Sequence, residues 1–212
     1  MGSHFTTLPA GVGLANRRSR ATLPSMTTIR PASAQDAAGI ATVYVDAWRS
    51  AYAAILPHRV LLGMSCEQQA RQWSWTVRDE RQSVIVATEA DHGVVGFVSF
   101  GRARLRDRLA IEHFAGAGDA KIGEIYTLYV QPDCQDRGIG RQLVTGAFAA
   151  MAGKGCRCGL LWVLRDNPAR YFYERVGGKV IAERQERMWG CLTDQVCYGW
   201  SDLTQATATH SR

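Results

Sequence analysis

The chain has 212 residues and a formal net charge of +6, and 46% of its residues are hydrophobic. This length suits one ordinary domain, and the apolar content is enough for a sizeable core, which excludes wholesale disorder. No run of about 18 apolar residues occurs, so we expect no membrane-spanning helix. Arg17, Arg18 and Arg20 lie near the start of the chain, and the remaining charge is too mild for a typical nucleic-acid-binding surface.

Both ends of the chain lack the apolar periodicity of folded elements. Residues 1–25 contain no acid, and we expect a disordered leader or an added extension there, before a natural start at Met26. The Arg and Ser residues of this segment also fit a transit peptide, so that alternative stays open. A single domain is predicted over residues 26–203, followed by a flexible polar tail over 204–212.

Strand-like and helix-like patterns alternate from Thr28 onward, and Ser33 is a typical N-cap for the first helix. The first predicted elements are a strand at 28–31, helices over 34–49, 51–62 and 67–77, and a hairpin of strands at 83–89 and 94–100. A long loop over 102–121 follows, then a strand at 124–130, a helix over 138–151, a strand at 159–164, a helix over 167–175 and strands at 179–187 and 194–200. The order predicts a mixed α/β domain.

The cysteine pattern does not predict a metal site. Six cysteines occur, without a CxxC pair and without the paired-histidine spacing of a zinc site. No hydrophobic signal segment precedes them. We therefore expect free thiols, a cytoplasmic location and no bound metal.

One segment has the pattern of an anion-binding turn. A predicted strand ends at Val130, a polar stretch follows, and Gly138 and Gly140 stand one residue apart at the start of a helix. Glycine lets a ligand approach the backbone, and the unpaired N–H groups at a helix N-terminus bind anions. The segment lacks the third glycine of the dinucleotide fingerprint and the Gly-Lys-Ser/Thr of a P-loop. It therefore predicts a phosphate-binding loop of another kind.

Three motifs together resemble the GNAT family of N-acetyltransferases. Gln135-x-x-Gly138-x-Gly140 is similar to that family's acyl-CoA loop, residues 169–177 (ARYFYERVG) are similar to its A-x-x-F-Y-E-x-x-G helix, and Ile29-Arg-Pro is a common opening. The resemblance covers the chain from Ile29 to about Leu203. It implies an α/β (α+β) fold, in which helices flank a mixed, mostly antiparallel twisted sheet of about six or seven strands with a splayed central strand pair.

The resemblance also implies acetyl-CoA as cosubstrate. The backbone of Leu128, Tyr129 and Val130 would pair with the pantetheine arm. The loop would offer N–H groups to the pyrophosphate, which the helix dipole favours, from Asp136, Arg137, Gly138, Ile139, Gly140 and Arg141. Gln135, the first residue of the loop motif, is also expected to bind the cosubstrate. Asn167 stands one residue nearer to Ala169 than the asparagine of many relatives, and it would bond the pantetheine through a shifted turn.

Two catalytic candidates follow from the resemblance. Tyr173 occupies the position of a tyrosine that serves the leaving sulfur. A phenol with a pKa of about 10 can protonate a thiolate of pKa about 8.5 only uphill, so a hydrogen bond is the main expected role. Glu124 is the candidate general base, acting through a water, and strand alternation places it on the same face as Leu128. The alternatives are that Tyr173 only packs, that Glu124 organises the strand end, and that the amine arrives neutral.

Four aromatic residues are candidates for an acceptor pocket. Trp48 and Tyr52 are four apart on a predicted helix and share a face, and Tyr126 and Trp162 lie on predicted strands. The alternative is that they belong to the core. The sequence shows no cluster of carboxylates of the kind that an aminoglycoside acceptor requires.

The sequence therefore predicts an acetyl-CoA-dependent N-acetyltransferase. The acceptor is the primary amine of a small molecule or peptide, and it attacks directly within a ternary complex, because no cysteine or serine stands in a nucleophile arrangement. The resemblance allows a homodimer, and we expect no nucleic-acid or membrane partner. The alternative is a non-catalytic acyl-CoA-binding sensor or assembly module on the same fold.

Overall fold

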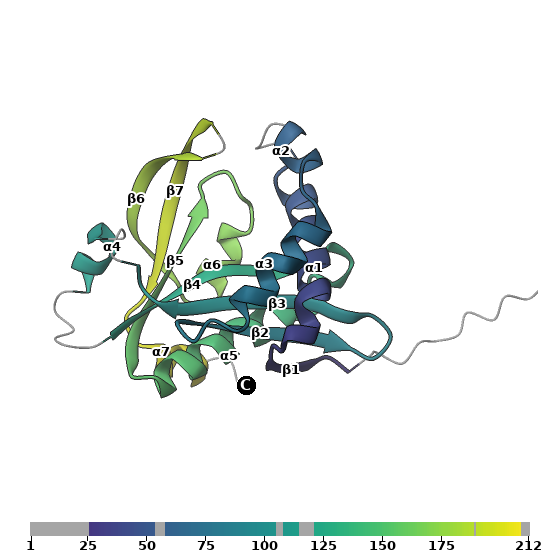
Figure 1. The fold of residues 1–212 in the computed structure, drawn as a ribbon. Coiled ribbons are helices and arrows are strands. Elements are labelled where there is room, and N and C mark those ends of the chain that lie inside the picture. The colour runs from purple at the N-terminus through teal and green to yellow at the C-terminus, as the bar shows by residue number, and fades with distance from the viewer. Residues whose placement is uncertain (1–25, 54–57, 105–107, 115–120, 189, 209–212) are drawn as a thin grey trace, which may run out of the picture.

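The computed structural model describes residues 26–53, 58–104, 108–114, 121–188 and 190–208 (Figure 1). The expected leader, residues 1–25, lies outside the described residues, and so does the end of the expected tail.

In the described part of the chain, seven strands form one sheet in the order β1-β2-β3-β4-β5-β7-β6 (Figure 1). The strands are β1 (Thr28–Pro31), β2 (Gln82–Glu89), β3 (Gly93–Arg102), β4 (Lys121–Val130), β5 (Cys156–Leu164), β6 (Lys179–Met188) and β7 (Cys191–Trp200). Every neighbouring pair is antiparallel except β4 and β5, which are parallel. The predicted mixed, mostly antiparallel sheet is confirmed.

The parallel strands β4 and β5 separate along their length. Their pairing stops at Ile125 and Leu161, although β4 continues to Val130 and β5 to Leu164. Beyond this point β4 stays paired with β3 on its other side. Within the described residues, the edge of β4 beyond Ile125 is therefore not paired with β5. Such an edge can pair with an extended ligand as it would with another strand.

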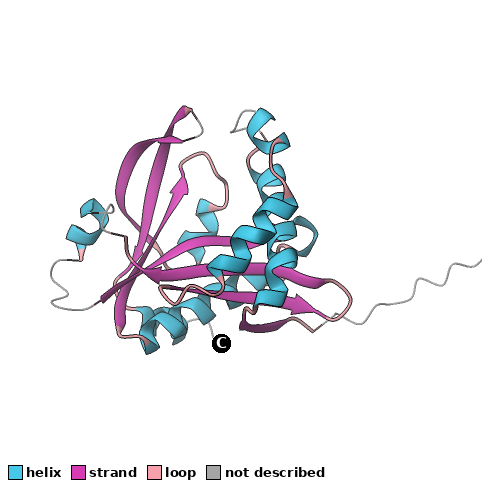
Figure 2. Cartoon of the chain, viewed as in Figure 1, coloured by secondary structure: helices cyan, strands magenta, loops and turns pink. Residues whose placement is uncertain are grey.

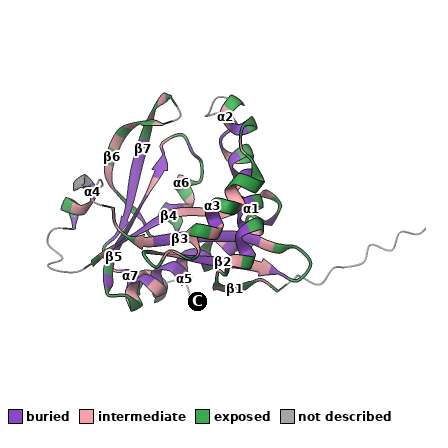
Figure 3. Ribbon diagram, in the orientation of Figure 1, coloured by how far each residue is buried: buried purple, intermediate pink, exposed green. Residues whose placement is uncertain are grey.

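Helices cover the two faces of the sheet (Figure 2). On one face lie α1 (Ala37–Ala51) and α3 (Cys66–Thr76), and on the other lie α5 (Ile139–Gly153) and α7 (Leu203–Ala208). The shorter helices are α2 (His58–Leu62), α4 (Arg108–His113) and α6 (Arg170–Arg175), with 3-10 turns at Ala34–Asp36 and Pro132–Cys134. Each of the two faces has its own apolar cluster, and the sheet between them is buried along its middle (Figure 3).

Two segments are more ordered than the sequence predicts. The expected loop over 102–121 contains α4, and residues of the expected flexible tail form α7. Helix α7 is held because the side chain of Leu203 is fully buried in the cluster beneath α5. The burial of Leu203 therefore helps to hold α7 in place, although most other residues of the expected tail are polar.

The start of α1 is fixed by a buried carboxylate. Asp36 accepts hydrogen bonds from Arg30 at 2.7 and 2.8 Å and from the backbone N–H of Ser33 at 2.7 Å. The hydrogen bonds from Arg30 lower the pKa of Asp36 to about 2. A carboxyl whose pKa is lowered in the folded state contributes stability above its unfolded pKa of about 3.9, and this contribution is lost as the pH falls through the folded value.

We expect Asp36→Asn to lower the free energy of unfolding at neutral pH by about 2 kcal/mol, since each pKa unit corresponds to about 1.4 kcal/mol. The deficit relative to the unchanged protein should shrink as the pH falls from about 4 to about 2. Urea unfolding of the variant and of the unchanged protein at several pH values measures this difference in the free energy of unfolding. Asp79→Asn is the matched control, because Asp79 pairs with the exposed Arg81 at 3.0 Å, and its effect should be much smaller. Equal effects of the two substitutions would contradict this account.

Candidate functional site

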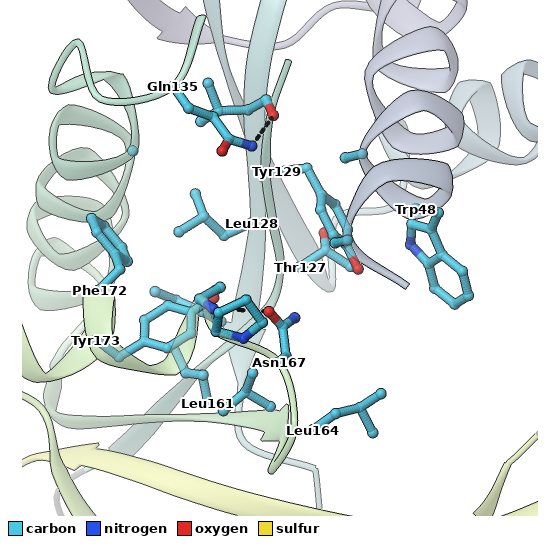
Figure 4. A pocket seen from close by; sticks show the side chains of 18 of the residues that line it. Trp48, Thr127, Leu128, Tyr129, Gln135, Leu161, Leu164, Asn167, Phe172 and Tyr173 are labelled. Atoms are coloured by element: carbon cyan, nitrogen blue, oxygen red, sulfur yellow. Dashed lines mark hydrogen bonds between the residues drawn. The ribbon is translucent and has the colours of Figure 1, made fainter. Parts of the chain in front are cut away.

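A cavity of about 850 Å³ lies where β4 and β5 separate. Its walls come from the end of α1, the separated halves of both strands, the β4–α5 loop and α6 (Figure 4). All residues expected at the site line it, except Arg137 and Glu124. The lining residues are Trp48, Tyr52, Tyr126, Leu128, Tyr129, Val130, Gln135, Asp136, Gly138, Ile139, Gly140, Arg141, Trp162, Asn167 and Tyr173. Distant parts of the sequence thus meet at one place.

The loop before α5 has the geometry of an anion-binding turn. Gly138, the N-cap of α5, has a φ of 78°, and Asp136 has a φ of 57°. A Cβ on Gly138 would meet nothing within 4 Å, so this glycine is needed for its left-handed backbone rather than for space. Successive N–H groups in such a turn point into one concavity, and the N-terminus of a 15-residue helix adds a partial positive charge.

Gly140, in the first turn of α5, lies close to Phe172 and Val130. A Cβ at this position would lie 3.4 Å from Cζ of Phe172 and 3.9 Å from Cγ2 of Val130. Phe172 also lines the cavity and lies beside Tyr173 on α6, across from Leu128 (Figure 4). Phe172 belongs to the motif of residues 169–177 but received no role from the sequence, whereas the structure places it in the wall of the site.

Arg137 supports the loop from outside the cavity. Its Nη2 donates to Oε1 of Glu89 at 2.6 Å, and the carboxyl of Glu89 is 1% exposed. Glu89 also accepts a hydrogen bond from Thr27 at 2.9 Å. The side chain of Arg137 therefore ties the loop to the β2–β3 hairpin. Glu89 is a positioning residue that the sequence did not reveal, because its partner is 48 residues away.

Tyr173 lies in the cavity wall next to the open edge of β4 (Figure 4). Its side chain is buried, and its ring lies 5.4 Å from that of Phe172. Burial, with a smaller contribution from the nearby Tyr52, raises the pKa of Tyr173 above its usual value. The phenol is thus neutral and protonated over the working range of most enzymes, and it can donate a hydrogen bond.

Asn167 connects α6 to the end of α1. Its Oδ1 accepts from the backbone N–H of Ala169 at 2.9 Å, and its Nδ2 donates to the hydroxyl of Tyr52 at 3.3 Å. The Tyr52 hydroxyl also lies 3.5 Å from that of Tyr129. This network joins three parts of the wall and occupies Oδ1 and one N–H of the Asn167 amide.

Glu124 does not lie on the face of Leu128, so that part of the prediction is wrong. Ser99 pairs with Thr127 and Phe100 pairs with Ile125, which leaves Tyr126 as the extra residue of a β-bulge. A bulge shifts the alternation by one residue. Glu124 therefore shares its face with Thr127, and it does not line the cavity.

The carboxylate of Glu124 is fully buried and is engaged by Arg104. The backbone N–H of Arg104 donates to Oε2 at 3.0 Å and its Nε donates to Oε1 at 2.9 Å. The guanidinium of Arg104 also stacks over the ring of Tyr126 at 4.8 Å. This arrangement holds β4 to the segment after β3, next to the bulge.

We expect Glu124→Gln to lower the free energy of unfolding by roughly 2 kcal/mol, because the variant loses a buried charged partner of Arg104. Acetyl transfer by the folded variant should change far less. Glu67→Gln, which removes the exposed partner of Arg71, is the matched control and should leave stability nearly unchanged. Thermal unfolding and initial rates test both. A large loss of rate with unchanged stability would instead identify Glu124 as a base.

All four aromatic candidates line the cavity, and we call the part of its wall formed by Tyr44, Trp48, Tyr126, Tyr129 and Trp162 the acceptor half. Arg184 stacks over the ring of Trp162 at 4.0 Å. The sequence did not single out Tyr44, because its spacing in α1 is that of an ordinary core-facing residue. Met188 and Gln195, from the β6–β7 hairpin, also line the cavity and were not expected there.

No helix in the described ranges is long and apolar enough to cross a membrane. Among the same residues, no group of three or more His, Cys, Asp or Glu side chains is arranged to hold a metal ion.

Comparisons with known proteins agree with this geometry. An N-acetyltransferase of Bacillus subtilis (strain 168) named YuaI is 28% identical over 84% of this chain and 95% of its own length. The aminoglycoside N(6')-acetyltransferase type 1 of Stenotrophomonas maltophilia is 27% identical over 64% of this chain and 74% of its own. The structure of yncA from Salmonella typhimurium with its cofactor acetyl-CoA has a TM-score of 0.60 at 24% identity, over 84% of this chain and 95% of that one.

A family model described as the Acetyltransferase (GNAT) family matches residues 35–178, which include the central strands, the α5 loop and α6. The same segment builds most of the cavity, and its relatives are N-acetyltransferases. The chain is thus an acyltransferase that belongs to the GNAT family.

Proposed function

We propose that this protein transfers the acetyl group of acetyl-CoA to the primary amine of a small molecule or peptide within a ternary complex. The proposal rests on the observation that three features line the same cavity. They are the anion-binding turn before α5, the open edge of β4 and the buried Tyr173. Their order matches the pyrophosphate, the pantetheine arm and the thioester of acetyl-CoA.

The cosubstrate would be held mainly by backbone groups. The N–H groups from Gln135 to Arg141 bind the pyrophosphate, and the edge from Leu128 to Val130 pairs with the amides of the pantetheine arm. Gln135 stays close to this edge, since its Nε2 donates to the carbonyl of Val130 at 3.3 Å. Asn167 supports the site by fixing the turn before α6 and the hydroxyl of Tyr52.

Transfer proceeds by direct attack. The amine nitrogen bonds to the carbonyl carbon of the thioester, the carbon–sulfur bond breaks, and the thiolate of CoA leaves. Tyr173 donates a hydrogen bond to the sulfur as negative charge develops there, which lowers the barrier. The proton of the attacking nitrogen passes to water, because Glu124 is engaged by Arg104 outside the cavity.

The pH dependence follows from these assignments. The fraction of neutral amine rises with pH, and the pKa of Tyr173 is raised above its ordinary value of 10. We expect kcat/KM to rise with pH towards the pKa of the acceptor, without a falling limb below about pH 10. A pH–rate profile measures it. A falling limb near pH 8 would contradict a protonated Tyr173 as the essential donor.

The proposal is tested by acceptor-dependent release of CoA thiol, together with mass spectrometry of the product. We expect N-acetylated product in the same amount as released thiol. Binding of acetyl-CoA without transfer to any amine in a broad panel would favour an acyl-CoA-binding sensor instead.

A further inference from the structure

We propose, on the basis of the function above, that the acceptor is a small primary amine with a single positive charge and an apolar, preferably aromatic, body. Trp48 and Tyr44 on α1 are the residues that bind this body. The two features that carry this inference are a wall of packed aromatic rings and the distribution of charge around the acceptor half.

Part of the acceptor half consists of aromatic rings in contact with one another. The rings of Tyr44 and Trp48 lie 5.2 Å apart, and Tyr129 meets Tyr44 edge-on at 5.5 Å. Trp73 does not line the cavity, and the centre of its ring lies 5.9 Å from that of Tyr44. Trp48 borders the cavity in Figure 4, opposite Tyr173. Such rings offer a large apolar area for an aromatic or aliphatic body.

Few acidic side chains line the cavity within the described ranges of the chain. Asp136 is the one acid among the described residues that line the cavity, and it belongs to the loop before α5. Glu124 and Glu186, which do not line the cavity, form ion pairs with Arg104 and Arg184. The guanidiniums of these arginines stack on Tyr126 and Trp162, which places positive charge on that side. Among the described lining residues, an acceptor with several ammonium groups would meet no carboxylate outside the loop before α5, so each additional charge adds a desolvation cost that a singly charged amine avoids.

The same surroundings help the chemistry. An apolar wall disfavours the charged ammonium and lowers the pKa of a bound amine. A larger fraction of the acceptor then becomes neutral and can attack. The cavity of about 850 Å³ must hold the acetyl end of the cosubstrate as well, which favours a small acceptor.

The test compares three acceptors at one pH: phenethylamine, a linear alkyl diamine and kanamycin. Binding of acetyl-CoA is measured first on the same protein preparation. We expect kcat/KM for phenethylamine to exceed that for the other two by at least roughly tenfold, as the burial of one aromatic ring predicts.

Substitutions of Trp48 test whether this residue binds the aromatic body of the acceptor. Trp48→Ala should raise the KM for phenethylamine by about tenfold or more, with a smaller change in kcat and an unchanged KM for acetyl-CoA. Trp48→Phe, which keeps a ring, should restore most of the affinity. Trp75→Ala is the matched control, because Trp75 on α3 is 75% exposed and lies outside the cavity, and it should have no effect. If Trp48→Ala does not fold, Tyr44→Leu replaces it.

The outcomes separate the two proposals. A preference for the diamine or for kanamycin would overturn the inference and leave the proposed function standing. Equal effects of Trp48→Ala and Trp75→Ala would also overturn it. Binding of acetyl-CoA without transfer to any amine would overturn both the inference and the transfer reaction, and an absence of acetyl-CoA binding would overturn the proposed function itself.

Discussion

Replacing Tyr173 with Phe should lower kcat by about 100-fold, while the affinity for acetyl-CoA stays unchanged. The substitution removes one hydroxyl from a side chain that is otherwise packed against Phe172 and Tyr198, with ring centres 5.4 and 5.9 Å away. Packing is therefore kept, and the leaving thiolate loses its hydrogen-bond donor. Initial-rate kinetics with saturating acetyl-CoA measure the effect.

Tyr171→Phe provides the matched control, because Tyr171 lies on the same helix but is 49% exposed. It should retain full activity. If Tyr173→Phe also retained full activity, the assigned role of Tyr173 would be wrong, and its conformity to the family motif would reflect packing alone.

Gly140→Asp should weaken acetyl-CoA binding by about 100-fold or more without unfolding the protein. A carboxylate in the first turn of α5 fills the approach to the N–H groups and repels the pyrophosphate. For the protein alone, the same carboxylate is favourable, because it complements the helix dipole and replaces a glycine inside a helix. We therefore expect Gly140→Asp to bind acetyl-CoA more weakly than the unchanged protein and to be equally or more stable to heat.

Gly153→Asp is the control at the opposite end of α5, where a Cβ would meet nothing within 4 Å. There the charge opposes the dipole, so stability should fall by a few tenths of a kcal/mol while binding remains. An equilibrium titration with acetyl-CoA measures the affinity of each variant, and thermal unfolding measures its stability. Normal binding by Gly140→Asp would mean that the pyrophosphate lies elsewhere.

The sequence predicted the site best where the functional residues are close together in the chain. Gly138 and Gly140 directly follow a strand and open a helix, so the turn could be predicted from neighbouring residues alone. The position of Tyr173 followed from a contiguous motif. The splay of β4 and β5 was implied by the family resemblance, and the end of pairing at Ile125 confirms it.

Features that depend on partners distant in the sequence were missed or misplaced. The face of Glu124 depends on the bulge at Tyr126, which is defined only by the register with β3. The side chain of Arg137 is directed by Glu89, and neither residue type nor spacing reveals that partner. Tyr44 has ordinary helix spacing, and its place in the cavity wall arises from the way in which α1 crosses β4.

Calorimetric titration of the unmodified protein with acetyl-CoA tests the central claim most directly. The account predicts saturable binding in the micromolar range at one site, with ATP giving no signal at the same concentration, because the open β4 edge recognises the pantetheine arm as well as the phosphates. Equal binding of ATP and acetyl-CoA, or no binding of acetyl-CoA, would contradict it.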